Sequence, residues 1–139
     1  MSREKTRVLV ADDDQAILKL VCTIIGRERL EVDCVGDGQQ AIEKLQQREY
    51  AVVLLDLMMP RVDGFGVIEF LKKHPPEHKP VVLVITAYAD QKFKLVDPTI
   101  VTGVLRKPFE VADLGNIVSL CVEGFDEALA PVVPMHRIG

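Results

Sequence analysis

The chain has 139 residues, of which 48% are hydrophobic and 27% are charged, a composition typical of one globular domain and not of a disordered segment. Its formal net charge is -4, and its 17 Lys and Arg residues form no basic run, which argues against direct binding of nucleic acid. No apolar run is long enough to span a membrane, and the N-terminal segment has no signal-peptide hydrophobic region. We therefore expect a cytoplasmic protein that does not enter the membrane.

Strand and helix patterns alternate along the chain. Short apolar runs predict strands, and apolar residues at helical spacing predict the helices between them. The predicted strands cover residues 7–11, 31–35, 50–56, 81–85 and 101–105. The predicted helices cover residues 17–28, a segment opened by Asp37-Gly38, and residues 64–73, 91–96 and 110–129. This alternation predicts a parallel sheet with helices on both faces, because each parallel pairing needs a crossover connection.

Local composition refines this outline. The strand at 31–35 alternates only partly between apolar and polar residues, which indicates an edge or near-edge position. Pro75-Pro76 ends the third helix, and Asp97-Pro98-Thr99 falls where the fourth helix would continue, so we expect that helix to be short or displaced. Residues 130–139, with two prolines, are predicted to be a loose tail after a domain at 1–129.

Cysteine and histidine residues give no sign of a disulfide framework or a zinc site. Cys22, Cys34 and Cys121 are odd in number, far apart and set in apolar patterns, so we expect reduced thiols. His74 and His78 flank two prolines, which favours a solvated loop over a metal site.

A single carboxylate ends the most apolar strand. Residues 50–55 contain no charged residue, and Asp56 follows them. In an open parallel sheet the carboxyl ends of the strands form the ligand crevice, so Asp56 is a candidate functional residue. The alternative is a helix cap, but Asp63-Gly64 stands where the cap of the next helix belongs.

Polar side chains follow four of the predicted strands. Asp12 and Asp13 follow the first strand, Asp56 the third, Thr86 the fourth and Lys107 the fifth. One edge of the sheet would gather them, and converging carboxylates favour a hard cation such as Mg²⁺. A metal, an ammonium group and a hydroxyl beside a nucleophilic carboxylate suit phosphoryl transfer.

These motifs resemble the receiver domain of two-component response regulators. The resemblance runs from about residue 7 to about residue 129, and its motifs are residues 8–14, 54–60, 63–64, 86–87 and 107–109. It implies a flavodoxin-like, three-layer α/β/α fold with a five-stranded parallel sheet in the order 2-1-3-4-5. It also implies a phosphorelay function in which the protein catalyses only its own phosphorylation and dephosphorylation and is not otherwise an enzyme.

The same resemblance assigns roles to single residues. Asp56 would accept the phosphoryl group, Thr86 would bond to it and Lys107 would pair with its oxygens. The implied Mg²⁺ ligands are Asp12, acting largely through water, Asp13, Asp56 and the carbonyl of Met58. We expect the surplus carboxylate, Asp14, to cap the first helix.

Partners also follow from the resemblance. The donor would be a phosphohistidine on a histidine kinase or on a histidine phosphotransfer protein. Further candidates are a downstream protein partner and a phosphorylation-dependent homodimer.

Besides the interruption of the fourth helix at Asp97-Pro98-Thr99, one departure from the family pattern bears on signalling. Val104 stands where the family usually has a Tyr or Phe that moves with the threonine. The resemblance also implies that the positions of Met58 and Tyr88 gate the hydrolytic water, and since neither side chain can orient a water molecule we expect slow self-dephosphorylation. The alternative is that both side chains only rest on the surface.

Three alternatives stay open. Asp12-Asp13-Asp14 also fits the Asp-x-Asp start of haloacid-dehalogenase-type phosphatases, although Ala16 stands where that class usually has Thr or Val. A flavin-binding module would need a phosphate-binding loop after the first strand, where three carboxylates stand instead. A receiver-like scaffold that no longer switches is favoured by Val104 and Pro98 but not by the complete acceptor set.

Overall fold

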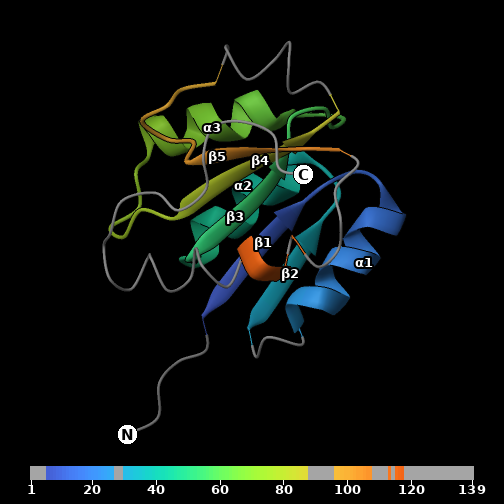
Figure 1. The fold of residues 1–139 in the computed structure, drawn as a ribbon. Coiled ribbons are helices and arrows are strands. Elements are labelled where there is room, and N and C mark those ends of the chain that lie inside the picture. The colour runs from blue at the N-terminus through green and yellow to red at the C-terminus, as the bar shows by residue number, and fades with distance from the viewer. Residues whose placement is uncertain (1–5, 27–29, 88–95, 108–112, 114, 118–139) are drawn as a thin grey trace, which may run out of the picture.

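The protein folds around a parallel sheet of five strands in the order β2-β1-β3-β4-β5, as seen in Figure 1. The computed structural model describes residues 6–26, 30–87, 96–107, 113 and 115–117. The strands are β1 (Arg7–Ala11), β2 (Glu31–Val35), β3 (Val52–Asp56), β4 (Val81–Thr86) and β5 (Gly103–Arg106). The predicted sheet order and the edge position of β2 are confirmed.

Within the described part of the chain, three helices lie between the strands. They are α1 (Gln15–Gly26), α2 (Gly38–Gln47) and α3 (Gly64–Lys73). The predicted cap of α3 is present, since Asp63 accepts a hydrogen bond from the Gly66 amide at 3.0 Å. Asp37, in the dipeptide expected to open α2, caps that helix by accepting a hydrogen bond from the Gln40 amide at 2.8 Å. Asp14 likewise accepts a hydrogen bond from the Ala16 amide at 3.0 Å, at the start of α1.

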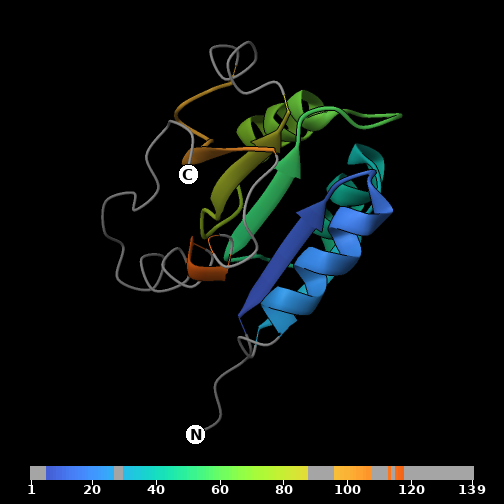
Figure 2. The same cartoon turned by 45° about the vertical axis from the view of Figure 1, so that its right-hand side comes forward.

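The two faces of the sheet bury separate hydrophobic clusters, because successive strand residues point to opposite faces. Val8, Val10, Leu54 and Ile85 face the layer that contains α1, together with Ile117. The alternate residues, such as Leu9 and Leu55, face α2 and α3. Figures 1 and 2 show α1 on one side of the sheet and α2 and α3 on the other. The three-layer arrangement follows from this alternation.

Some predicted boundaries differ from the structure. The third strand begins at Val52 and not at residue 50, and the fifth strand covers Gly103–Arg106 and not 101–105. Residues 98–100 form a turn in which Thr99 donates to the Asp97 side chain, so Pro98 does not lie in a helix. The predicted fourth helix at 91–96 and the tail at 130–139 lie largely or wholly outside the described residues. Asp113 and residues 115–117 are helical, in agreement with the last predicted helix.

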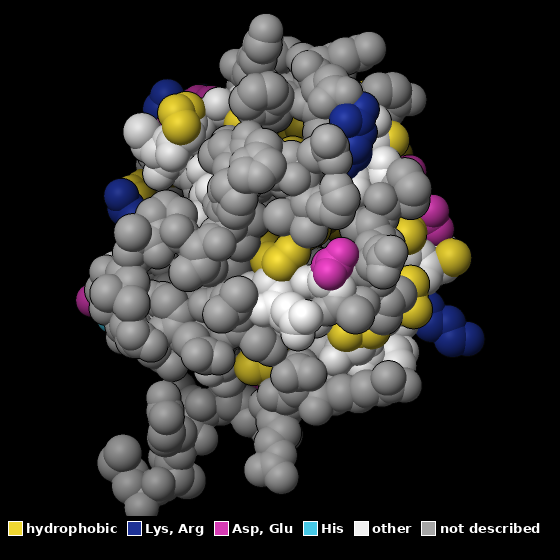
Figure 3. All heavy atoms as spheres, in the orientation of Figure 1, with side chains coloured by type: hydrophobic (Ala, Val, Ile, Leu, Met, Phe, Trp, Pro, Cys, Tyr) yellow, Lys and Arg dark blue, Asp and Glu magenta, His cyan; other side chains and the backbone are white. Residues whose placement is uncertain are grey.

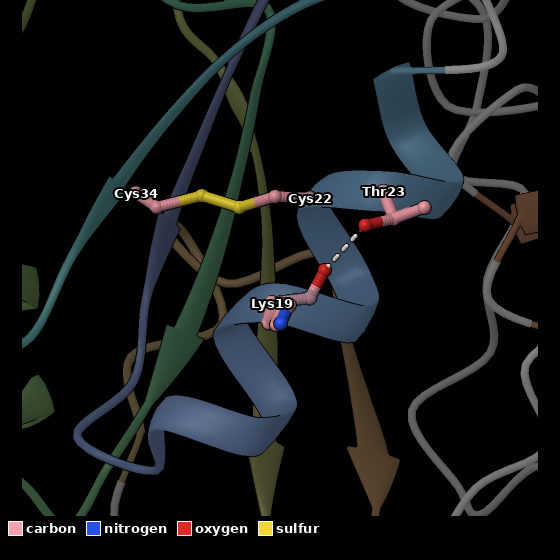
Figure 4. The surroundings of a disulfide bond; sticks show 4 residues. All are labelled: Lys19, Cys22, Thr23 and Cys34. Atoms are coloured by element: carbon pink, nitrogen blue, oxygen red, sulfur yellow. Dashed lines mark hydrogen bonds between the residues drawn. A yellow bond between two sulfur atoms is a disulfide. The ribbon is translucent and has the colours of Figure 1, made fainter.

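Two cysteines that were expected to be reduced form a disulfide. Figure 4 shows Cys22 on α1 joined to Cys34 on β2, and their Cα atoms are 7.0 Å apart. The expectation was wrong because the packing of α1 beside β2 brings together two residues that lie 12 positions apart in sequence. Cys121 lies outside the described residues.

The surface of the described residues carries mixed charge. Figure 3 shows basic side chains scattered among acidic and apolar ones on the face in view. Within the described ranges, no helix is both long enough and apolar enough to cross a membrane.

Candidate functional site

The strand register brings Asp12 and Asp56 to the same level of the sheet. Ala11 of β1 pairs with Leu55 of β3, and the next residue in each chain segment is the carboxylate. Both carboxylates are buried. The candidate site therefore lies at the carboxyl edge of the two central strands, where an open parallel sheet forms its ligand crevice.

Thr86 and Lys107 reach the same edge from β4 and β5. Thr86 pairs with Arg106 in the sheet register, and the Lys107 amide donates to the Thr86 carbonyl at 3.0 Å. Thr86 is fully buried at the end of its strand. The structure thus gathers the strand-end residues Asp12, Asp56, Thr86 and Lys107 as the sequence predicted.

Lys107 pairs with two buried carboxylates. Its Nζ lies 2.9 Å from Asp12 Oδ2 and 3.3 Å from Asp56 Oδ2. The other carboxylate oxygens are held by the backbone: the Asp14 amide donates to Asp12 Oδ1 at 3.0 Å, and the Met58 amide donates to Asp56 Oδ1 at 3.1 Å. Each carboxylate is therefore oriented by its own loop and turns one oxygen toward the ammonium group.

Burial and charge change the protonation of the site. The pKa of Asp56 is raised from 3.8 to about 6, chiefly by burial and also by the neighbouring Asp12 carboxylate, while the Met58 amide and Lys107 oppose the change. Burial lowers the pKa of Lys107, but its pairing with Asp12 and Asp56 outweighs that effect and leaves the pKa raised. Lys107 is therefore charged at neutral pH and compensates part of the negative charge.

The carboxylates fit a divalent cation. Ligand oxygens of Asp12, Asp13 and Asp56 lie within 4.8 Å of one another, and Asp13 is exposed whereas the other two are buried. The buried Oδ2 of Asp12 accepts no well-aligned hydrogen bond from the described residues, although the Lys107 ammonium lies close to it. A cluster of hard oxygen donors that is open to solvent on one side suits Mg²⁺ with several waters.

The loop that follows Asp56 is fastened to the start of α2. The Gly38 amide donates to the Val62 carbonyl at 2.8 Å, and Arg61, which has a positive φ of 66°, places its Nε 3.6 Å from Asp37 Oδ2. These contacts were not predicted from the sequence. The only indication was the glycine in each of the dipeptides Asp37-Gly38 and Asp63-Gly64, which lets another backbone segment pass close to it.

Gly64 supports the acceptor itself. Its amide donates to the Leu57 carbonyl at 2.9 Å, and a Cβ atom at this position would lie 2.5 Å from the Asp56 carbonyl oxygen. The first turn of α3 therefore packs directly on the backbone of Asp56. From the sequence, Gly64 was expected to begin a helix and to belong to a family motif, but its contact with Asp56 was not predicted.

Gly64→Ala should lower the free energy of unfolding by about 1–3 kcal/mol, because the added methyl group meets backbone atoms that cannot move aside cheaply. Urea denaturation would measure the change. Gly26→Ala is the matched control, since a Cβ there meets nothing within 4 Å. Equal effects of the two substitutions would contradict the contact with Asp56.

The fold and the site together define a flavodoxin-like α/β domain with a carboxylate and lysine site at the carboxyl edge of its sheet. A family model described as the response regulator receiver domain matches residues 8–119, and the chain belongs to this family. The phosphatase and flavin-binding alternatives are disfavoured by this membership.

Known relatives agree with the assignment. The signal transduction histidine-protein kinase BarA of Escherichia coli (strain K12) is 31% identical over 112 residues, which cover 79% of this chain and 12% of the kinase. The chain therefore spans about an eighth of the length of this relative.

Two solved structures share the fold. A receiver domain protein from Methanospirillum hungatei JF-1 matches with a TM-score of 0.80 and 20% identity, covering 91% of this chain and 100% of that one. The receiver domain of the sensor histidine kinase PA1611 from Pseudomonas aeruginosa PAO1 matches with a TM-score of 0.76 and 21% identity, covering 86% and 99%. The latter structure has a magnesium ion coordinated in its active site cleft.

Proposed function

We propose that this chain acts in a phosphorelay by accepting a phosphoryl group on Asp56 from the phosphohistidine of a histidine kinase or histidine phosphotransfer protein. The observation that carries the proposal is the grouping of Asp56 with Asp12, Asp13 and Lys107 at the carboxyl edge of the sheet. In the reaction a carboxylate oxygen of Asp56 forms a bond to phosphorus as the phosphorus–nitrogen bond of the donor breaks. The donor imidazole regains a proton.

The surrounding residues would hold the transferred group. Lys107, which now lies 3.3 Å from Asp56 Oδ2, would pair with phosphoryl oxygens, and the buried Thr86 would bond to the group from the neighbouring strand. Asp12, Asp13, Asp56 and the Met58 carbonyl would hold Mg²⁺. When bound, Mg²⁺ would neutralise negative charge on the transferring phosphoryl group.

The output must follow a route that does not depend on an aromatic switch. Val104 is 3% exposed and packs within the cluster that faces α2 and α3, so it cannot swing between buried and exposed positions as a ring would. We propose that the domain signals by binding a partner or by passing the phosphoryl group onward. Val104 also supports the second candidate, a scaffold that does not switch, whose biological activity would survive Asp56→Asn.

The proposed setting is the cytoplasm, with no direct nucleic-acid or membrane contact and no activity as an enzyme on other substrates. A kinase or phosphotransfer protein would approach near α1 and Lys107, whose Nζ lies 3.3 Å from Asp56 Oδ2, so that its phosphohistidine can reach Asp56. A phosphorylation-dependent homodimer is a further partner consistent with this chemistry.

Intact mass after incubation with acetyl phosphate tests the proposed acceptor. We expect a gain of one phosphoryl group that requires Mg²⁺ and is abolished in Asp56→Asn and by EDTA. Asp63→Asn is the matched control, because asparagine also caps helices well and the residue lies outside the carboxylate cluster. A folded protein that gains no phosphoryl group, or gains it in Asp56→Asn, would refute the proposal.

The phosphorylated form should decay slowly by itself. Met58 is 46% exposed, two residues after Asp56, and its thioether cannot orient a water molecule for attack. The second gating position, Tyr88, lies outside the described residues. Met58→Asn combined with Tyr88→Glu should speed the loss of the phosphoryl group by roughly 10²-fold, the lower end of what one positioned acid or base group contributes. An unchanged decay rate, followed by intact mass after donor removal, would contradict this role.

A further inference from the structure

We propose that Cys22 and Cys34 form a reversible redox site whose oxidation fastens helix α1 to the edge strand β2. The pair is the disulfide drawn in Figure 4, and it lies outside the carboxylate cluster. It is a modification site distinct from the proposed acceptor.

Both cysteines can be reached from the solvent. Cys34 is exposed on β2 and Cys22 is partly exposed on α1. Both line a groove of about 670 Å³ together with Lys19 and Gln40. A small thiol or disulfide can therefore reach the sulfur atoms without unfolding the protein.

The fold keeps the two cysteines together whether or not they are bonded. Cys34 is paired with Val10 of β1 in the sheet register, and α1 is anchored by the buried side chains of Val21 and Ile25. The Cα separation of 7.0 Å is at the upper limit for joining two cysteines without moving the backbone. The bond can therefore form and break within one folded arrangement.

The linked segments flank the acidic turn after β1. The residue after Cys34 is Val35, whose carbonyl accepts a hydrogen bond from the Asp12 amide at 3.1 Å. On the other side, α1 begins directly after Asp14. A covalent bond between α1 and β2 therefore braces this turn from both neighbouring elements.

The oxidant would be a low-molecular-weight disulfide of the glutathione type. The two cysteine thiols lose two protons and two electrons and form one sulfur–sulfur bond, while the oxidant's disulfide is reduced to two thiols. In a reducing cytosol, disulfides are commonly transient and redox-sensing, which suits an exposed pair of this kind better than a permanent structural bond.

The test uses the full chain with Cys121→Ser, so that only Cys22 and Cys34 can react. After incubation in buffers of graded reduced-to-oxidised glutathione ratio, thiol counting and intact mass should show an intramolecular disulfide that dithiothreitol reverses. The oxidised form should melt roughly 10 °C higher than the reduced form, because the cross-link restricts the unfolded chain. Hydrogen exchange followed by NMR should be slower at the Asp12 amide in the oxidised form than in the reduced form.

In the Cys121→Ser protein, the further substitution Cys34→Ser should abolish both the difference in melting temperature and the difference in Asp12 amide exchange between oxidising and reducing conditions. Failure to form the bond at any ratio, a glutathione adduct on one thiol, or a disulfide-linked dimer would overturn the proposal. An intramolecular bond that leaves both the melting temperature and Asp12 exchange unchanged would also overturn it. None of these measurements depends on phosphorylation, so they are independent of the proposed acceptor function.

Discussion

Lys107→Met should lower the free energy of unfolding by about 3 kcal/mol at pH 8 in the absence of metal, because it leaves two buried carboxylates without their cation. Lys107 is 20% exposed at its side chain, whereas the Asp12 side chain is fully buried and the Asp56 side chain is 6% exposed. Methionine keeps much of the length of the lysine side chain, so the loss of packing is small. Urea denaturation in EDTA would measure the change.

A surface lysine provides the control. Lys73 is 67% exposed and lies 3.6 Å from Glu69, so Lys73→Met should cost less than about 1 kcal/mol. A double-mutant cycle adds a direct test: the cost of Lys107→Met should shrink in an Asp56→Asn background, where one carboxylate charge has been removed. An identical cost in both backgrounds would show that Lys107 and Asp56 are not coupled.

Asp56→Asn should raise the free energy of unfolding of the metal-free protein by about 2 kcal/mol at pH 7. The pKa of Asp56 rises from 3.8 to about 6 in the folded state, chiefly through burial. The folded protein therefore holds this proton more tightly than the unfolded chain does. This tighter binding of the proton stabilises the folded protein fully below pH 3.8. The stabilisation is lost as the pH rises to about 6 and stays lost above it.

The pH profile separates this effect from a general change in packing. In EDTA, the wild type should lose stability between pH 4 and pH 6 relative to Asp56→Asn, and the difference should stay constant above that range. Mg²⁺ should stabilise the wild type more than the variant, since a ligand that binds only the folded state raises its stability. If the free energy of unfolding changed with pH in the same way in both proteins, or if Mg²⁺ stabilised both equally, the claim that the buried charge of Asp56 destabilises the metal-free protein would be wrong.

Much of the fold could be predicted from local sequence. The apolar runs ending at Ala11 and Asp56 predict buried strands, Asp37-Gly38 predicts the start of α2 and Asp63 the cap of α3, because these signals depend only on neighbouring residues. Boundaries were less accurate at β5, where the chain after Pro98 first forms a turn and the sheet pairing starts only at Gly103. Strand ends depend on the partner strand as well as on the sequence of the strand itself.

By itself, the sequence determined the alternation of strands and helices, the family motifs, and the four strand ends that carry polar residues, since each is a matter of residue order. Only the tertiary structure decided the register that puts Asp12 level with Asp56, the pairing of Lys107 with both carboxylates, and the contact of Gly64 with the acceptor backbone. It also decided the disulfide, which the separate apolar patterns around Cys22 and Cys34 did not indicate. These features depend on distances between segments far apart in sequence, and such distances arise only when the sheet and helices pack together.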